Sequence, residues 1–176
     1  MVLVPDYATC IKLLIHHSTP FNVINHVIFT TQTALKISKR LKKHNFSINC
    51  DIVLAGAMLH DLGRSKTHQL THGIIGAQML RQNGFSDELA RIAEIHLFAG
   101  ILAEEAREFG LPSKDYVPLT LEEKIITYAD NISKKNSLLT TREVITRFSK
   151  YFDSSHPILI RVYELHNEIE DLLASN

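Results

Sequence analysis

The sequence has little cysteine, no excess of charge of either sign and no long apolar run, and each of these features narrows the possible functions. The two cysteines, Cys10 and Cys50, are isolated, so no zinc or redox spacing is present. Nineteen basic residues balance nineteen acidic ones, which leaves no overall field toward nucleic acid or an anionic membrane. No stretch approaches the roughly 18 uncharged apolar residues of a membrane span. The chain start, Met1 to Asp6, lacks the basic and apolar parts of a signal peptide, so we expect a cytoplasmic protein.

The remaining composition is that of a globular protein. The chain has 176 residues, of which 45% are hydrophobic and 22% are charged, so we expect one domain spanning 1–176. Apolar residues recur at helical spacing almost throughout, and no run alternates with period two. The sequence therefore predicts an all-α fold of eight or nine helices. Their expected ranges are 6–16, 21–44, 52–62, 71–82, 87–98, 102–109, 120–133, 142–152 and 156–173.

Local signals fix several of these ends. Thr120 and Glu123 form a capping box, and Pro157 suits the first turn of the last helix. Gly63 is expected to stop the third helix. The helices of 142–174 are expected to pack on a core formed by 21–135. The last helix carries an apolar stripe that is either core or the seam of a homodimer; it comprises Leu159, Val162, Leu165, Ile169, Leu172 and Leu173.

The most informative dipeptide is His60-Asp61, which follows an apolar run. Residues 52–59 are apolar on nearly every side, so their helix is expected to be deeply buried. Burying an unpaired carboxylate is costly, and a metal cation removes that cost because it takes both side chains as ligands. The alternative is a hydrogen-bonded His–Asp pair that closes the helix. The dipeptide alone does not decide between the two interpretations.

Two further helices carry a polar side chain in an apolar setting. His26 lies in the long second helix, and Asp130 lies at the end of the apolar run 125–130. Taken singly, each is more often a satisfied core residue. Together with His60-Asp61, they place metal-competent side chains on three helices. Mixed imidazole and carboxylate donors suit Mn²⁺, Fe²⁺, Co²⁺, Ni²⁺, Zn²⁺ or, with more oxygen ligands, Mg²⁺.

The order His26, His60-Asp61, Asp130 resembles the HD superfamily of metal-dependent phosphohydrolases, over about 21–135. The tetrapeptide 60–63, His-Asp-Leu-Gly, is close to the His-Asp-Ile-Gly variant of that superfamily. The segments 71–77, 96–101 and 122–125 are also similar to a group of small, stand-alone archaeal HD proteins whose substrate is not settled. The resemblance implies a helical bundle in which His26, His60, Asp61 and Asp130 hold one divalent cation.

Two more histidines take a role from the same resemblance. His72 begins its helix, and His96 comes late in another. In two-metal branches of the superfamily, histidines at these places hold a second metal, and the Asp of the His-Asp pair bridges the two ions. Those branches often have a His-His pair where this chain has His96-Leu97. Two interpretations therefore stay open: a second metal at His72 and His96, or a pocket lining that binds phosphate by hydrogen bonds.

The chemistry that the resemblance implies needs an activated water and positive charge around it. A bound divalent ion lowers the pKa of its water from about 15.7 toward ~7, which provides hydroxide to attack phosphorus. Arg64 directly follows the 60–63 motif, where many relatives have Lys, and a guanidinium suits two phosphate oxygens. The candidate catalytic residues are Asp61, Arg64, His72 and His96. Further candidates for contact with the substrate are Lys66, His68 and Lys134, although solvated surface is the simpler explanation for the two lysines.

Other polar residues have a structural explanation. The segment from Lys36 to Lys43 is a basic helix end, which the helix dipole favours; a nucleic-acid contact is the alternative, without interleaved aromatic residues to support it. The cysteines are expected to be small buried hydrophobes. We place four histidines at surface or capping positions: His16, His17, His156 and His166.

Three functional hypotheses follow from these residues. The first is a metal-dependent phosphohydrolase that cleaves a phosphomonoester or phosphodiester of a nucleotide or a related small metabolite. The second is a nucleotide-binding or regulatory HD module without turnover, against which the complete ligand set argues. The third is a nucleic-acid-processing phosphodiesterase that binds through 36–43. We expect a small phosphorylated substrate as partner, no membrane and a homodimer.

Overall fold

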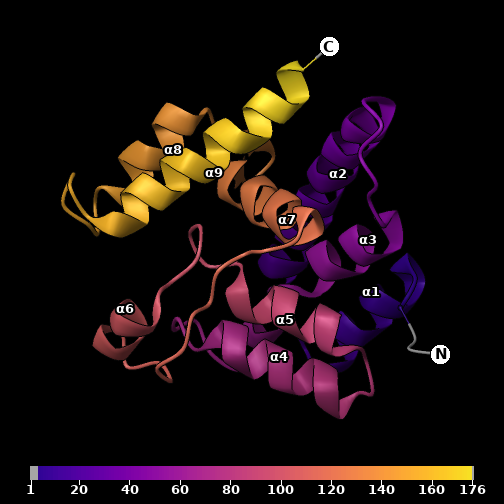
Figure 1. Ribbon diagram of the computed structural model, residues 1–176. Helices are drawn as coiled ribbons and strands as arrows, with labels where there is room; N and C mark the ends of the chain where they lie inside the picture. The colour runs from indigo at the N-terminus through magenta and orange to yellow at the C-terminus, as the bar shows by residue number, and fades with distance from the viewer. Residues whose placement is uncertain (1–3, 176) are drawn as a thin grey trace.

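The computed structural model describes residues 4–175 and is almost entirely helical (Figure 1). The α-helices of this described part are α1 (Tyr7–His16), α2 (Phe21–Lys43), α3 (Cys50–Leu59), α4 (His72–Gln82), α5 (Asp87–Ile95), α6 (Ala103–Glu108), α7 (Leu121–Ile132), α8 (Thr141–Phe148) and α9 (Pro157–Ala174). A 3-10 helix, η1 (Leu62–Ser65), precedes α4, and a hairpin of β1 (Ser133–Lys134) and β2 (Ser137–Leu138) follows α7. The predicted all-α fold is confirmed. The hairpin was not predicted, because two-residue strands are too short to show an alternating pattern.

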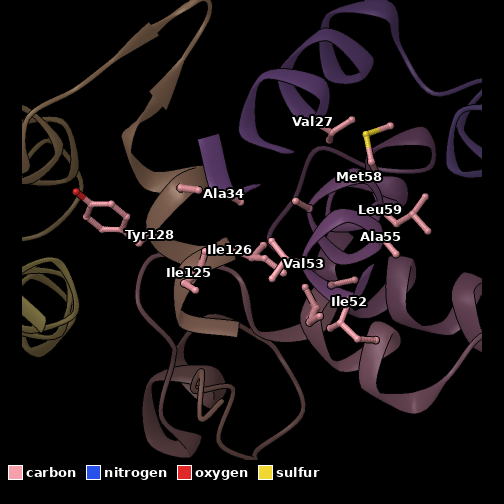
Figure 2. Close-up of a cluster of buried hydrophobic side chains, with 14 of the residues drawn as sticks. Val27, Ala34, Ile52, Val53, Ala55, Met58, Leu59, Ile125, Ile126 and Tyr128 are labelled. Atoms are coloured by element: carbon pink, nitrogen blue, oxygen red, sulfur yellow. The ribbon is translucent and has the colours of Figure 1, made fainter. Parts of the chain in front are cut away.

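Helix α3 forms the centre of the core. Its apolar run allows it to be covered on all sides, and it packs against α1, α2, α5 and α7. Figure 2 shows its side chains interleaved with those of α2 and α7. The α3 residues in this cluster are 2% exposed or less; they are Ile52, Val53, Ala55, Met58 and Leu59. Because α3 is held on every side, its last turn has a fixed position deep in the molecule.

The other helices lie on two sides of this centre (Figure 1). Helices α4 and α5 pack against each other, and α4 also packs on η1. On the other side, α8 and α9 pack together and contact α7, which in turn packs on α2 and α3. Helix α6 lies at the edge of the fold (Figure 1). No helix within the described part is both long and apolar enough to cross a bilayer.

Several helix ends follow the sequence signals. The Ser86 hydroxyl accepts a hydrogen bond from the first turn of α5. Thr120 and Glu123 form the expected capping box at α7. At the start of α9, the His156 ring accepts from the N–H of Ile158, and Pro157 occupies the first turn. These caps satisfy backbone donors that have no partner within a helix.

Three helices end earlier than predicted. Helix α3 stops at Leu59, because η1 turns toward α4 so closely that a Cβ at Gly63 would lie 1.9 Å from the carbonyl oxygen of His72. Helix α5 stops at Ile95, and Phe98 takes a left-handed backbone conformation with φ 58°. Helix α8 stops at Phe148 rather than at 152. Each of these early ends lies beside the candidate site described below.

Some single residues also differ from expectation. His166 is completely buried rather than at the surface, because its position in α9 falls between Val162 and Ile169 on the buried face. Cys10 is buried as predicted, whereas Cys50 is only partly buried at the start of α3. The stripe of α9 is core for four of its members, namely Leu159, Val162, Leu165 and Ile169. The expected homodimer stays a prediction.

Candidate metal centre

Four polar side chains from α2, α7 and the end of α3 meet at the centre of the fold. The Nε2 atom of His26 lies 2.7 Å from Oδ1 of Asp130, which joins α2 to α7. His60 follows the last turn of α3, and its Nε2 lies 3.4 Å from the same Asp130 oxygen and 3.8 Å from Oδ2 of Asp61. The sequence segments that carry these groups are far apart, and helix packing brings them together.

Three histidines of the centre are oriented by the same local bond. Nδ1 of His60 lies 2.8 Å from the carbonyl oxygen of Ala57. His96 makes the equivalent bond to Ala93 at 2.8 Å, and His72 makes it to Gln69 at 2.7 Å. Because a carbonyl only accepts, Nδ1 must carry the proton in each ring. In the neutral rings, Nε2 is then left as the lone-pair donor, the arrangement found in histidines that bind metal.

The Nε2 atoms of these rings lack a hydrogen-bond donor among the described residues that could satisfy their lone pairs. Nε2 of His60 is fully buried and has no hydrogen-bond partner among the described residues. Nε2 of His72 and Nε2 of His96 lie 3.2 Å apart, so two lone pairs face each other unless a proton or a cation lies between them. Carboxylate oxygens surround the same atoms. This donor set fits a divalent cation, which would accept the lone pairs and offset the carboxylate charge.

Two groups of three donors have all their ligand atoms within 4.8 Å of one another. One consists of His26, His60 and Asp130, and the other of His60, Asp61 and His96. His60 belongs to both groups, and in the second group Oδ2 of Asp61 faces His60 while its Oδ1 lies 3.5 Å from Nε2 of His96. His72 adds a further nitrogen 3.0 Å from the same Oδ1. The arrangement has enough donors for one ion, and places Asp61 where it could be shared by two.

The charges of the centre depend on each other. Burial on its own lowers the pKa of His60, but Asp61 and Asp130 outweigh it and raise that pKa to about 9. Burial likewise tends to raise the pKa of both carboxyl groups, and the neighbouring histidines hold them well below the ordinary value. For His96, burial is the dominant cause and lowers its pKa. Without a bound cation, a proton on His60 would therefore offset the charge of the two carboxylates.

The centre lies at the bottom of a cavity of about 440 Å³. Arg64 and His68, two of the candidates for substrate contact, line this cavity, and Nε of Arg64 lies 2.9 Å from Oδ1 of Asp61. The structure does not bring Lys66 or Lys134 to this cavity; both side chains are exposed to solvent. Lys66 directly follows η1, and Lys134 lies in β1 of the hairpin.

The cavity also has a wall that the sequence did not predict. Arg147 and Phe148 of α8 line it together with Phe98 and Asn131. Nη2 of Arg147 donates to the carbonyl oxygen of Asn131 at 3.1 Å. No sequence signal singled out Arg147, because a basic residue in the last turn of a helix is common for dipole reasons alone. Its role depends on how α8 packs.

Comparison with known proteins gives matches over most of the chain. The model of the HD domain family matches residues 23–135. An uncharacterised protein of Methanocaldococcus jannaschii is 42% identical over 152 residues, which cover 86% of this chain and 90% of that protein. A tRNA (cytidine(56)-2'-O)-methyltransferase of Picrophilus torridus is 36% identical over 96% of this chain, but the chain spans only 48% of that protein.

A solved structure shares the fold at low sequence identity. It is the HD domain of the L. monocytogenes phosphodiesterase PgpH in complex with cyclic-di-AMP, with a TM-score of 0.52 and 17% identity. The similarity covers 87% of this chain and 89% of that one. HD domains typically bind divalent metals, and this chain has a cluster of histidines and aspartates that could hold such an ion. From the family match and the relatives, the chain belongs to the HD domain family.

Proposed function

We propose that this protein is a metal-dependent phosphohydrolase that cleaves a phosphate ester of a nucleotide or a related small metabolite. The observation that carries the proposal is the buried Nε2 atom of His60, which has no hydrogen-bond partner and faces two carboxylates. A ring nitrogen buried beside two carboxylates needs either a proton or a cation to offset their charge, and a divalent cation would take the place of that proton. The proposed ligands of that cation are His26, His60, Asp61 and Asp130.

The donor chemistry favours a transition metal. Two imidazoles and two carboxylates suit Mn²⁺, Fe²⁺, Co²⁺, Ni²⁺ or Zn²⁺, whereas Mg²⁺ is more often held by oxygen alone. When bound, such an ion supplies Lewis acidity and a water of lowered pKa. Hydrogen bonds to backbone carbonyl oxygens already fix the rings of His60, His72 and His96, so these rings need little reorientation when a cation binds.

The chain's own residues would bind and orient the phosphate. Arg64 is half-buried at the cavity wall, and its guanidinium pairs with Asp61. Because a cation would take over the charge of Asp61, we expect Arg64 to be released to hold phosphate oxygens. His68 lies nearby, with its carbonyl oxygen 3.5 Å from Nη1 of Arg64.

Two features favour a small, nucleotide-like substrate. A cavity of about 440 Å³ lies within the range of pockets that bind small molecules. Its wall carries guanidinium groups, which suit a phosphate. It also carries the apolar side chains of Leu70, Leu97 and Phe98, which suit a flat or apolar group. The PgpH domain, whose fold is similar, was crystallised with cyclic-di-AMP. A phosphate ester of a nucleotide therefore fits the proposed site better than a phosphate group without a flat or apolar part.

A second ion at Asp61, His72 and His96 is part of the proposal. The close approach of the two Nε2 atoms supports it, because a cation between them removes the repulsion of their lone pairs. The alternative is that these histidines hold a phosphate oxygen by hydrogen bonds, with one ring protonated. Metal stoichiometry distinguishes them: the first predicts two ions per chain and the second predicts one.

Nucleic-acid processing is the weaker candidate function. The basic helix end lies at the C-terminal part of α2, whereas His26 lies near its beginning. Thirteen residues separate His26 from Lys39, which is roughly 20 Å along a helix axis. A single nucleotide cannot reach both, so only a polymer would use these lysines. The Picrophilus relative is named for a tRNA modification, but this chain matches only about half of it, and we do not assign methyl transfer to this chain.

The test is metal analysis followed by an activity panel. Purified protein is loaded with Mn²⁺ or Co²⁺ and assayed on nucleoside monophosphates, cyclic dinucleotides and short RNA. We expect Asp61→Ala to weaken metal binding at least ~100-fold and to abolish turnover, because a direct ligand matters more than an outer-shell group. The control is Asp171→Ala, an exposed carboxylate of α9.

Three results would overturn parts of this proposal. Full turnover by Asp61→Ala would refute the site. Tight metal binding without turnover on the whole panel would favour a nucleotide-binding or regulatory module. Hydrolysis of RNA alone, lost when Lys39, Lys42 and Lys43 are changed to Gln, would favour nucleic-acid processing.

A further inference from the structure

Arg147 stands out among the partly buried arginines of residues 4–175. In this part of the chain they are Arg64, Arg91, Arg147 and Arg161. Three of these form ion pairs, with Asp61, Glu123 and Glu105 respectively. Arg147 has no carboxylate oxygen within 4.0 Å among the described residues, although it lines the cavity. Asp130 acts on this guanidinium from beyond that distance, so the partly desolvated charge has no direct ion pair and an anion in the cavity could supply one.

The side chain of Arg147 is nevertheless held in place. Nη2 donates to the carbonyl oxygen of Asn131 at 3.1 Å, and the guanidinium carbon lies 4.6 Å from the ring centroid of Phe148. Asn131 itself is buried, and its side-chain amide donates to the carbonyl oxygen of Phe98. This leaves Nε and Nη1 of Arg147 without a hydrogen-bond partner within residues 4–175. Two donors of one planar group are thus available at the cavity.

The position of Arg147 complements that of Arg64. Arg64 lies beside Asp61, at the end of α3, whereas Arg147 bonds to the residue that follows Asp130 in α7. Arg64 thus forms an ion pair with one carboxylate of the proposed centre, whereas Arg147 acts on the other, Asp130, only from longer range. The carboxylate of Asp130 is already engaged by His26 at 2.7 Å. It does not pair directly with Arg147.

We propose that Arg147 binds the phosphate group of the substrate, as a second guanidinium that acts together with Arg64. This inference rests on the proposed function and names an anion-binding residue for the same cavity. A phosphate ester offers several oxygens, and planar guanidinium groups can each hold two of them. Because α8 lies outside the 23–135 segment that matches the HD model, substrate binding would depend on a part of the chain that the metal ligands do not occupy.

The probe for this proposal is inorganic phosphate, measured by calorimetry on full-length protein saturated with Mn²⁺. Arg147→Gln removes the charge but keeps an amide that can donate to Asn131. Arg147→Lys keeps the charge but loses the planar pair of donors. The matched control is Arg142→Gln, which lies on the same helix and is exposed.

We expect Arg147→Gln to weaken phosphate binding about tenfold or more, the usual effect of losing a hydrogen bond to a charged group. Arg147→Lys is expected to fall between Arg147→Gln and the wild type, and Arg142→Gln to match the wild type. Mn²⁺ content should be unchanged in all three variants, since none of these residues is a proposed ligand. In turnover assays, Arg147→Gln should act mainly on KM.

The outcomes separate this inference from the proposed function. If the wild type binds Mn²⁺ and hydrolyses substrate while Arg147→Gln keeps full phosphate affinity, the role of Arg147 is refuted and the phosphohydrolase stands. If Arg147→Gln and Arg147→Lys both lose Mn²⁺ or melt early, Arg147 supports the fold rather than the substrate, and the inference is also refuted. If the wild type binds no metal, the proposed function itself fails.

Discussion

The buried His166 should make the protein sensitive to acid. Its side chain is 0% exposed and lies in α9, where its ring packs edge-on against Tyr128 at 4.7 Å. The Thr141 hydroxyl donates to Glu170 at 2.6 Å, so its oxygen accepts from Nδ1 of His166 at 3.0 Å. Nε2 is buried without a partner among the described residues. Protonation of Nε2 would therefore create a buried donor with no acceptor.

The magnitude follows from the pKa of this ring. Burial lowers the pKa of His166 from 6.5 to about 4; Glu170 opposes this change, and Arg147 adds to it. In the unfolded chain the ring titrates near its ordinary pKa, so below about pH 6.5 the unfolded state binds a proton that the folded state does not. Folding stability then decreases as pH falls from 6.5 to 4. At about 1.4 kcal/mol for each pH unit, the loss approaches 3 kcal/mol over this window.

The variant His166→Asn measures this effect, because its amide can replace Nδ1 as donor to Thr141 but cannot be protonated. Urea unfolding of both proteins is followed by circular dichroism between pH 7.5 and 4.5, in the presence of a chelator. We expect the variant to be less stable at pH 7.5, where it loses packing against Tyr128. Between pH 7.5 and 4.5, the free energy of unfolding of the variant should rise by roughly 2 to 3 kcal/mol relative to that of the wild type. If the difference between the two proteins stayed constant with pH, the account of His166 would be wrong.

Two further substitutions test the centre and its support. His72→Ala should lower turnover and leave the ion at His26 and Asp130 in place. If the second site exists, the metal content measured by mass spectrometry should fall from two ions per chain to one. Gly63→Ala should cost about 2–3 kcal/mol and weaken metal binding, because its methyl group would lie 1.9 Å from the carbonyl oxygen of His72. Gly84→Ala is the control for Gly63→Ala in thermal melts, since open space surrounds Gly84 and only its left-handed backbone, worth about 1 kcal/mol, opposes the change.

The sequence predicted helices better than it predicted where they stop. Periodicity and caps, such as Thr120 with Glu123, are local properties, and the structure bears them out. The end of α3 at Leu59 depends instead on the close approach of Gly63 to His72, nine residues further on. That contact cannot be read from a sequence pattern. The early end is also what places His60 and Asp61 outside regular helix, where their side chains reach the centre.

The candidate ligands were predicted from a resemblance rather than from spacing alone. His26 and Asp130 are separated by 104 positions, and nothing local indicates that they lie 2.7 Å apart. The order of residues in a known superfamily supplied that information. For His166 a signal was present, because its spacing from Val162 and Ile169 places it on the apolar face of α9. Histidine is usually exposed or half-exposed, and this tendency favoured the incorrect prediction of a surface position.

Arg147 shows a limit of a different kind. The region that matches the HD model contains all six histidines and aspartates of the centre, but ends before α8. The sequence assigned 142–174 only a packing role, yet Arg147 and Phe148 form part of the cavity wall. Phe98 connects the two regions, because its ring packs against Phe148 at 5.2 Å while its carbonyl oxygen accepts from Asn131. A change in α8 would therefore alter the proposed anion-binding wall without touching a proposed metal ligand.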